Sequence, residues 1–167
     1  MEAEAIVARV DSHRGLVPSL LDRLIPQGTV SNTPTRWDGA SFEQMVEAVR
    51  RDLEALLNTR QTQGDLPDYY EELTRSVFTF GVPDVSMLSA LALDGDGEIG
   101  PLLAELIQRF EPRLREVRVT LTDKDRLGRE IRFHIEGRLR VEPFPELGFE
   151  TVLELTTGRA VITPTEG

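Results

Sequence analysis

The sequence predicts an α+β domain, with N-terminal helices packed on one face of a mostly antiparallel C-terminal sheet of about four strands. Before Pro112 the apolar residues recur every three to four positions, which is the spacing of a helix face. After Pro112 they alternate with polar residues, as in strands that bury one face. Helices followed by a run of strands indicate helices on one side of an antiparallel sheet.

The length and composition favour one water-soluble domain. The chain has 167 residues, of which 40% are hydrophobic and 29% are charged, and this suits one domain with its own core. Residues 1–15 are polar and unpatterned, so we expect a flexible arm followed by a single domain over 16–167. The apolar stretches are shorter than the ~20 residues of a membrane helix, and the acidic N-terminus lacks the basic region of a secretory signal. We therefore expect a cytoplasmic protein without direct membrane insertion.

Two long helices are predicted before Pro112. The first begins at Ser41, which can form a capping box with Gln44. Its apolar residues fall on one helical face; they are Phe42, Met45, Val46, Val49, Leu53, Leu56 and Leu57. The second helix carries a similar stripe from Ile99 to Phe110 and ends at Pro112, whose ring disfavours helical geometry in the preceding residue.

Weaker helical patterns accompany these two helices. Leu20, Leu21 and Leu24 form a short apolar turn near the start of the chain. Further short helices are expected within 69–80 and 84–91, and residues 26–40 are expected to form a loop because they are rich in Pro, Gly, Ser and Thr.

Four strands are predicted after Pro112. The alternation places them at 115–122, 130–141, 149–156 and 160–163. An open sheet has two edges, and an edge that is not charged, short or covered can pair with a neighbour's strand. In the last strand only Arg159 stands beside Ala160, Val161 and Ile162, so this edge is a candidate for accepting a strand from a partner.

No catalytic group, metal site or cofactor site is predicted. His134 lies on the polar face of a strand, without a partner at the spacing of a triad or a metal site. The run Asp94–Ile99 resembles the middle of an EF-hand loop, but Ala92 and Leu103 then fall where oxygen ligands are required. No cysteine is present, and the net charge of −10 disfavours nucleic acid as a partner. We therefore expect a binding protein rather than an enzyme.

The junction between the second helix and the first strand carries opposite charges on either side of Pro112. Glu111 and Arg113 are two residues apart, so in extended geometry their side chains point the same way. Two interpretations remain open at this point. The pair can seal the junction as a local ion pair, or it can present a carboxylate and a guanidinium to a partner.

Three segments follow one another in the chain: Leu56-Leu57-Asn58-Thr59-Arg60, Ser76–Asp84 and Phe110-Glu111-Pro112-Arg113-Leu114. Their order and spacing resemble those of the TssE-like baseplate subunits of type VI secretion systems, which belong with the lysozyme-related wedge proteins of contractile phage tails. The resemblance covers roughly residues 16–163. It departs from the family pattern at Phe78 and at Thr79-Phe80, where Leu and Asn-Tyr are expected.

The resemblance implies a non-catalytic wedge subunit at the inner face of the inner membrane. It implies that Glu111, Pro112 and Arg113 contact TssF-like and TssG-like subunits, and we assign Leu20, Leu21 and Leu24 to partner binding as well. On this basis Arg113→Glu is expected to abolish partner binding and to leave the isolated domain folded.

A TssK-like adaptor and the sheath are further candidate partners, with the edge at Ala160, Val161 and Ile162 accepting a segment of the first sheath ring. Two alternatives stay open. One is a wedge protein of a phage or phage-like tail, and the other is a peptidoglycan hydrolase, which the missing signal peptide disfavours.

Overall fold

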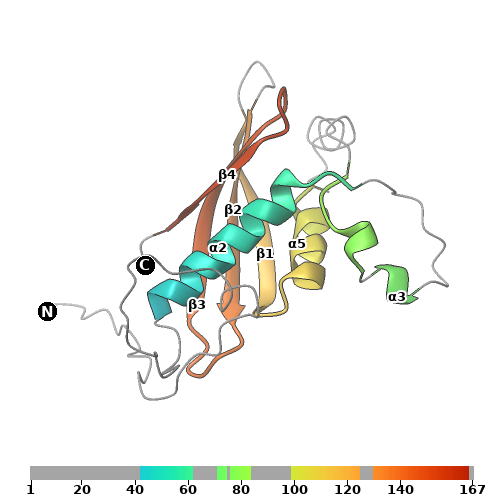
Figure 1. Cartoon of the computed structure of the whole chain (residues 1–167). Helices are drawn as coiled ribbons and strands as arrows, with labels where there is room; N and C mark the ends of the chain where they lie inside the picture. The colour runs from blue at the N-terminus through green and yellow to red at the C-terminus, as the bar shows by residue number, and fades with distance from the viewer. Residues whose placement is uncertain (1–41, 62–70, 75, 84–98, 125–129, 166–167) are drawn as a thin grey trace, which may run out of the picture.

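The computed structural model describes residues 42–61, 71–74, 76–83, 99–124 and 130–165 (Figure 1). In chain order these contain helices α2 (Phe42–Asn58) and α3 (Glu71–Thr74), the 3-10 turn η1 (Val77–Thr79), helix α5 (Ile99–Phe110), and strands β1 (Leu114–Lys124), β2 (Glu130–Leu139), β3 (Glu146–Glu154) and β4 (Ala160–Pro164). The predicted arm at 1–15, the turn at Leu20–Leu24, the loop at 26–40 and the helix at 84–91 lie outside the described residues.

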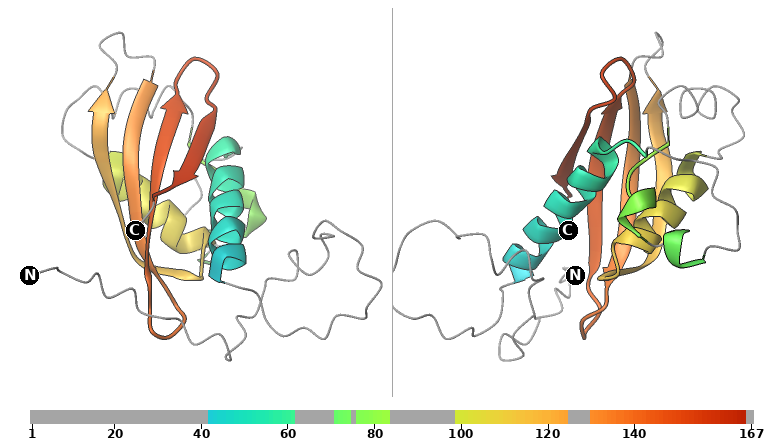
Figure 2. Two further views of the ribbon diagram at one scale, coloured as in Figure 1. Left: turned by 90° about the vertical axis from the view of Figure 1, so that its left-hand side faces the viewer. Right: turned by 45° about the vertical axis from the view of Figure 1, so that its right-hand side comes forward.

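The four strands form one antiparallel sheet in the order β1-β2-β3-β4. Helices α2 and α5 lie on the same face of this sheet, with α5 against β1 and α2 against β4 (Figure 2). The predicted α+β class is therefore confirmed. The bounds of β1, the end of β3 and the end of β4 differ from the prediction by one or two residues, and the largest difference is at one hairpin, where β2 ends at Leu139 and β3 begins at Glu146. The sequence prediction starts β3 too late because it overlooks Leu147, which is buried and extends the alternation of Phe149.

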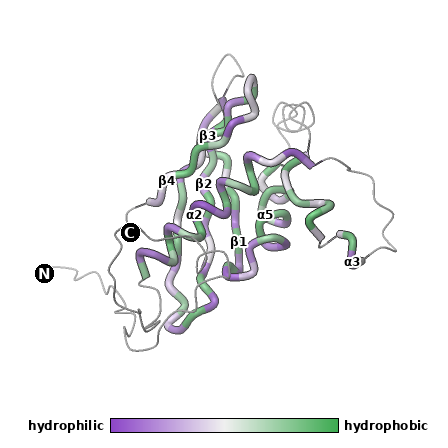
Figure 3. The backbone as a smooth tube through the Cα atoms, viewed as in Figure 1, coloured by the Kyte–Doolittle hydropathy of each residue, from purple (hydrophilic) through white to green (hydrophobic). Residues whose placement is uncertain are grey.

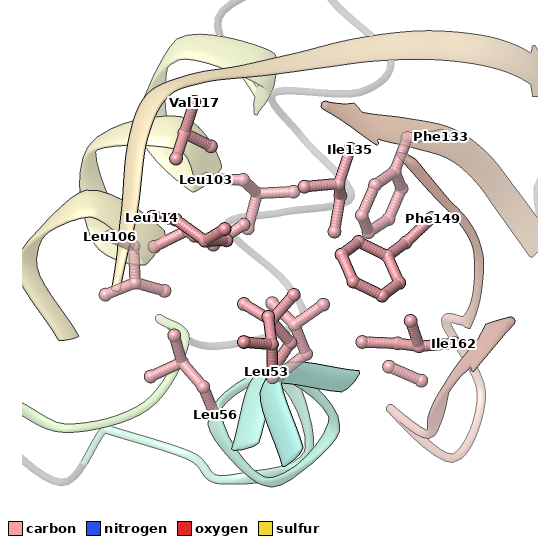
Figure 4. Close-up of a cluster of buried hydrophobic side chains, with 14 of the residues drawn as sticks. Leu53, Leu56, Leu103, Leu106, Leu114, Val117, Phe133, Ile135, Phe149 and Ile162 are labelled. Carbon is pink, nitrogen blue, oxygen red and sulfur yellow. The ribbon is translucent and has the colours of Figure 1, made fainter. Parts of the chain in front are cut away.

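The core lies between the two helices and the inner face of the sheet (Figure 4). Leu53 points from α2 into the middle of the cluster, Leu56 points from α2 toward Leu106 of α5, and Leu103 points from α5 toward Ile135 of β2. Phe133 and Phe149 fill the sheet side and are almost fully buried. Because burying each such side chain stabilises the fold by about 1.5–3 kcal/mol, this cluster supplies the main driving force for folding. Figure 3 shows the pattern behind it, with hydrophobic and hydrophilic residues alternating along the strands.

The end of α2 is tied to the start of β4 by one side chain. Asn58 Oδ1 accepts a hydrogen bond from the main-chain N–H of Ala160 at 2.9 Å, and Asn58 Nδ2 donates to the carbonyl of Ala160 at 2.9 Å. Arg60 adds a hydrogen bond to the carbonyl of Gly158 in the β3–β4 turn. This segment of the chain therefore joins the helix layer to the sheet.

The other edge strand, β1, is irregular and partly covered. One register shift follows Arg115 and another follows Leu121, and bulges of this kind bend an edge strand away from regular pairing. Gly100 of α5 approaches the same strand so closely that an added Cβ would lie 2.6 Å from the carbonyl oxygen of Val119. A helix end therefore meets each edge of the sheet.

Candidate partner-binding site at the helix–strand junction

The junction is a tight turn that reverses the chain from α5 into β1. The N–H of Glu111 continues the helix by donating to the carbonyl of Ile107 at 2.8 Å, and the N–H of Leu114 donates to the carbonyl of Glu111 at 3.1 Å. Pro112 lies at the outside of this turn and is exposed. The turn therefore projects a rigid proline between a helix end and a strand start.

The carboxylate of Glu111 lies under this turn and is held by Arg113. Glu111 is 3% exposed, and a buried carboxylate requires charged or hydrogen-bonded partners. Its Oε1 accepts from Arg113 Nε at 2.7 Å and from the main-chain N–H of Arg113 at 3.1 Å, and its Oε2 accepts from Arg113 Nη2. Side chain and main chain of one residue therefore satisfy the same buried carboxylate.

A third charged group, which the sequence prediction missed, completes the cluster. Asp52 of α2 accepts a hydrogen bond from Arg113 Nη2 at 2.5 Å, across 61 residues of sequence. Asp52 Oδ1 also accepts from Arg51 Nη2 at 2.8 Å. We call Asp52, Glu111 and Arg113 the junction cluster. The sequence places Asp52 directly before Leu53, near the apolar face of α2. This position indicates that Asp52 lies close to the core, but it does not indicate that Arg113 is its partner.

The junction cluster determines the charge state of its arginine. Burial alone would lower the pKa of Arg113, but the hydrogen bonds and charges of Glu111 and Asp52 more than offset it, so the pKa is raised above its usual value. Arg113 therefore stays positively charged throughout the accessible pH range.

The structure shows the local ion pair that seals the junction, which is the first of the two interpretations above. It also changes the expectation for Arg113→Glu. That side chain is only 21% exposed and touches two carboxylates, so reversing its charge would place three acids together and destabilise the domain. Of the three junction residues predicted to bind a partner, Pro112 is exposed, Arg113 is half-buried and Glu111 is buried.

The three residues predicted to bind at the sheet edge, Ala160, Val161 and Ile162, differ in whether their main-chain N–H and C=O groups point away from β3. Arg159 accepts a hydrogen bond from Glu154 N at 2.8 Å, and in an antiparallel ladder the direction alternates, so Val161 also faces β3. Ala160 faces outward but is already bonded by Asn58. Among the residues that the structure describes, no side chain caps the outward main-chain groups of Ile162 as Asn58 caps those of Ala160. Leu20, Leu21 and Leu24 lie outside the described residues.

The ring of His134 lies between the carboxylates of Glu136 and Glu150. Its Nδ1 lies 2.6 Å from Glu150 Oε1 and its Nε2 lies 3.5 Å from Glu136 Oε1, so each ring nitrogen faces a carboxylate rather than a hydroxyl. In the part of the chain that the structure describes, no group of three or more His, Cys, Asp or Glu side chains could hold a metal ion. Among the same residues, no helix is long and apolar enough to span a bilayer.

Comparison with protein families connects this architecture to a known class. A family model described as baseplate wedge protein gp25 matches residues 43–143. The matched span runs from the start of α2 through the junction cluster to the β2–β3 hairpin. The chain belongs to the gp25 family. TssE-like subunits belong to the same family, so the resemblance is confirmed. Searches of the curated proteins and of the solved structures gave no significant match.

Membership of the gp25 family supports a structural subunit of a baseplate. All three residues of the junction cluster lie inside the span shared with this family, whereas Leu20, Leu21, Leu24 and strand β4 lie outside it. The family relation therefore bears on the junction more directly than on the other predicted binding residues.

Proposed function

We propose that this gp25-family chain is a non-catalytic wedge subunit of a type VI secretion baseplate. It works in the cytoplasm at the inner face of the inner membrane, where it joins TssF-like and TssG-like subunits. The observation that carries the proposal is the exposed Pro112 on a turn that the junction cluster holds rigid. A preorganised turn loses little conformational entropy on binding, which favours affinity.

The junction cluster has two tasks in this proposal. Its buried charges fix the angle between α5 and β1, and they connect that turn to α2 through Asp52. The second task is to hold Pro112 in place, and Pro112 and the exposed part of Arg113 contact the wedge partners.

The partner contact is tested by Pro112→Asp. A tagged wild-type chain is expected to co-purify with the TssF-like and TssG-like subunits when all three are produced together. Pro112→Asp is expected to weaken that association at least 10-fold, because it places a charge at the centre of a contact, while the melting temperature changes by only a few degrees.

The matched control is Gln108→Asp, which adds the same charge to an exposed position one turn earlier on α5. It is expected to leave co-purification unchanged. Equal recovery of the partners with Pro112→Asp and with wild type would show that this turn is not the contact. No recovery with wild type would contradict the proposed function itself.

The second part of the proposal concerns the sheath. We propose that the subunit helps to start sheath assembly, with a TssK-like adaptor and the first sheath ring as further partners, and that an extended sheath segment pairs with the β4 edge. The outward main chain of Ile162 is the position where such pairing can begin, because Asn58 already bonds Ala160.

Sheath initiation has a direct cellular measurement. Cells that lack this chain are expected to form no fluorescently labelled sheaths, and the wild-type chain supplied from a plasmid is expected to restore them. Normal numbers of sheaths in cells without the chain would contradict a role in initiation, even if co-purification with the wedge partners were intact.

A further inference from the structure

The β2–β3 hairpin lies at the same end of the molecule as the junction. It projects beyond the sheet next to the corner where α5 passes into β1 (Figure 2). The main-chain N–H of Arg140 donates to the carbonyl of Arg113 at 2.8 Å, so the first residue of the hairpin loop is bonded to the junction itself. The loop and the junction therefore form one continuous surface.

The tip of this loop exposes an aromatic side chain. Phe144 is 38% exposed, and the guanidinium carbon of Arg115 lies 4.0 Å from the centroid of its ring. The contact orients the ring and brings a cation to it. Aromatic residues and arginine are enriched in the cores of protein interfaces, and together they supply much of the binding energy there.

The backbone at this position is unfavourable for a phenylalanine. Phe144 has φ +62, in the left-handed region, which glycine and asparagine adopt readily and bulky side chains rarely do. The other non-glycine residue with positive φ in the described chain is Glu116, at the bulge of β1. A strained position that carries a large exposed ring indicates that the ring serves something other than the fold.

The cations of this surface are only partly neutralised. Arg140 is exposed, makes no ion pair with any described residue and reaches only the carbonyl of Leu114, at 3.5 Å. The one carboxylate within the loop, Glu142, already interacts with another group. The guanidinium of Arg140 is therefore available to a carboxylate from outside.

We infer that Phe144 and Arg140 form a second contact of the wedge interface, continuous with Pro112, and that they fit a partner surface with an apolar pocket flanked by carboxylates. The ring of Phe144 enters the pocket, and Arg140 pairs with an acid at its rim. This inference rests on the proposed function, because it assigns the loop to the same partners, and it adds the chemistry that those partners must present.

The test uses Phe144→Asn in the full chain, with the purified complex of TssF-like and TssG-like subunits as the probe. Asparagine suits the left-handed backbone, so the melting temperature is expected to stay unchanged or to rise by a few degrees. The dissociation constant is expected to increase at least 10-fold. A substitution that improves the fold and weakens binding separates the two roles of this residue.

One further test variant, Arg140→Glu, and two matched controls, Phe78→Asn and Arg118→Glu, accompany it. Phe78→Asn removes a ring of similar exposure, 42%, from η1. Arg140→Glu is expected to weaken binding and to reduce its dependence on salt. Arg118 is another exposed arginine without an ion pair among the described residues, and it lies on the face of the sheet away from the helices. Arg118→Glu is expected to change neither the strength of binding nor its dependence on salt.

The possible outcomes distinguish a failure of the hairpin contact from a failure of the proposed function. If the wild-type chain does not bind the complex, this inference and the proposed function both fail. If wild type binds and Phe144→Asn binds equally well, or if Phe78→Asn weakens binding as much as Phe144→Asn, the hairpin contact is wrong and the junction contact still stands on its own test.

Discussion

Replacing Arg113 by methionine is expected to lower the free energy of unfolding by about 3 kcal/mol. The substitution keeps an unbranched apolar stem but leaves the carboxylate of Glu111 buried without its cation, and breaking a buried ion pair in this way costs about 3–5 kcal/mol. The lower end applies because Arg113 retains some exposure and water can reach part of the cluster. For a chain of this length the melting temperature should fall by about 6–12 °C.

The control for this prediction is Arg109→Met. Arg109 forms an ion pair with Glu105 at 2.8 Å on the exposed side of α5, and exposed pairs at this helical spacing contribute only about 0.3–0.5 kcal/mol. Thermal unfolding of both variants gives the comparison. Equal melting temperatures for the two would show that the junction cluster is no more stabilising than a surface pair.

The arrangement of helices and strands could be predicted because each element repeats its apolar residues with its own period. The stripe of α2 from Phe42 to Leu57 and the alternation along β2 are both buried as expected. The irregularities could not be predicted. The register shift after Arg115 adds one residue to β1, so Leu114 and Val117 are both buried although they are three residues apart, and a single spacing of three does not identify a bulge.

At the junction, too, one contact could be predicted from the sequence and another could not. Glu111 and Arg113 are close in sequence, so their pairing could be proposed from spacing alone. Asp52 joins them only because the core brings α2 against the end of α5, and sequence spacing carries no information about such a contact. Asn58 is a second example, since the helical pattern explains its position at the end of α2 but not its two hydrogen bonds to Ala160.

The hydrogen bonds of Asp52 and Asn58 make α2 a link between the two sides of the sheet. Asp52, in the second half of α2, is bonded to the junction at one side of the sheet, and Asn58, at the end of α2, is bonded to β4 at the other side. The helix therefore connects the surface proposed to bind the wedge partners with the strand proposed to meet the sheath. A substitution that disturbs the chain directly after α2, at residues 59–61, should therefore lower the stability of the whole domain.

Gly81→Ala tests that segment and is expected to lower the free energy of unfolding by about 3 kcal/mol. Gly81 has φ +114, which costs a residue with a side chain about 1–3 kcal/mol. An added Cβ would also lie 2.6 Å from the carbonyl oxygen of Thr59, and overpacking of this kind costs about 1–3 kcal/mol. The obstacle is main chain, so no side chain can rotate away. The bridge between Arg60 and Val82 has to open instead.

Urea unfolding of Gly81→Ala and Gly137→Ala makes the comparison quantitative. At Gly137 an added Cβ would meet its nearest neighbours at 3.6–3.7 Å, which is ordinary contact, so alanine is expected to change the free energy of unfolding by less than about 1 kcal/mol. Similar midpoints for the two variants would mean that the chain at 59–61 and 81–82 can separate at little cost. A lower midpoint for Gly81→Ala alone, at an unchanged slope, would show that the close approach of these two segments is part of what holds α2 in position.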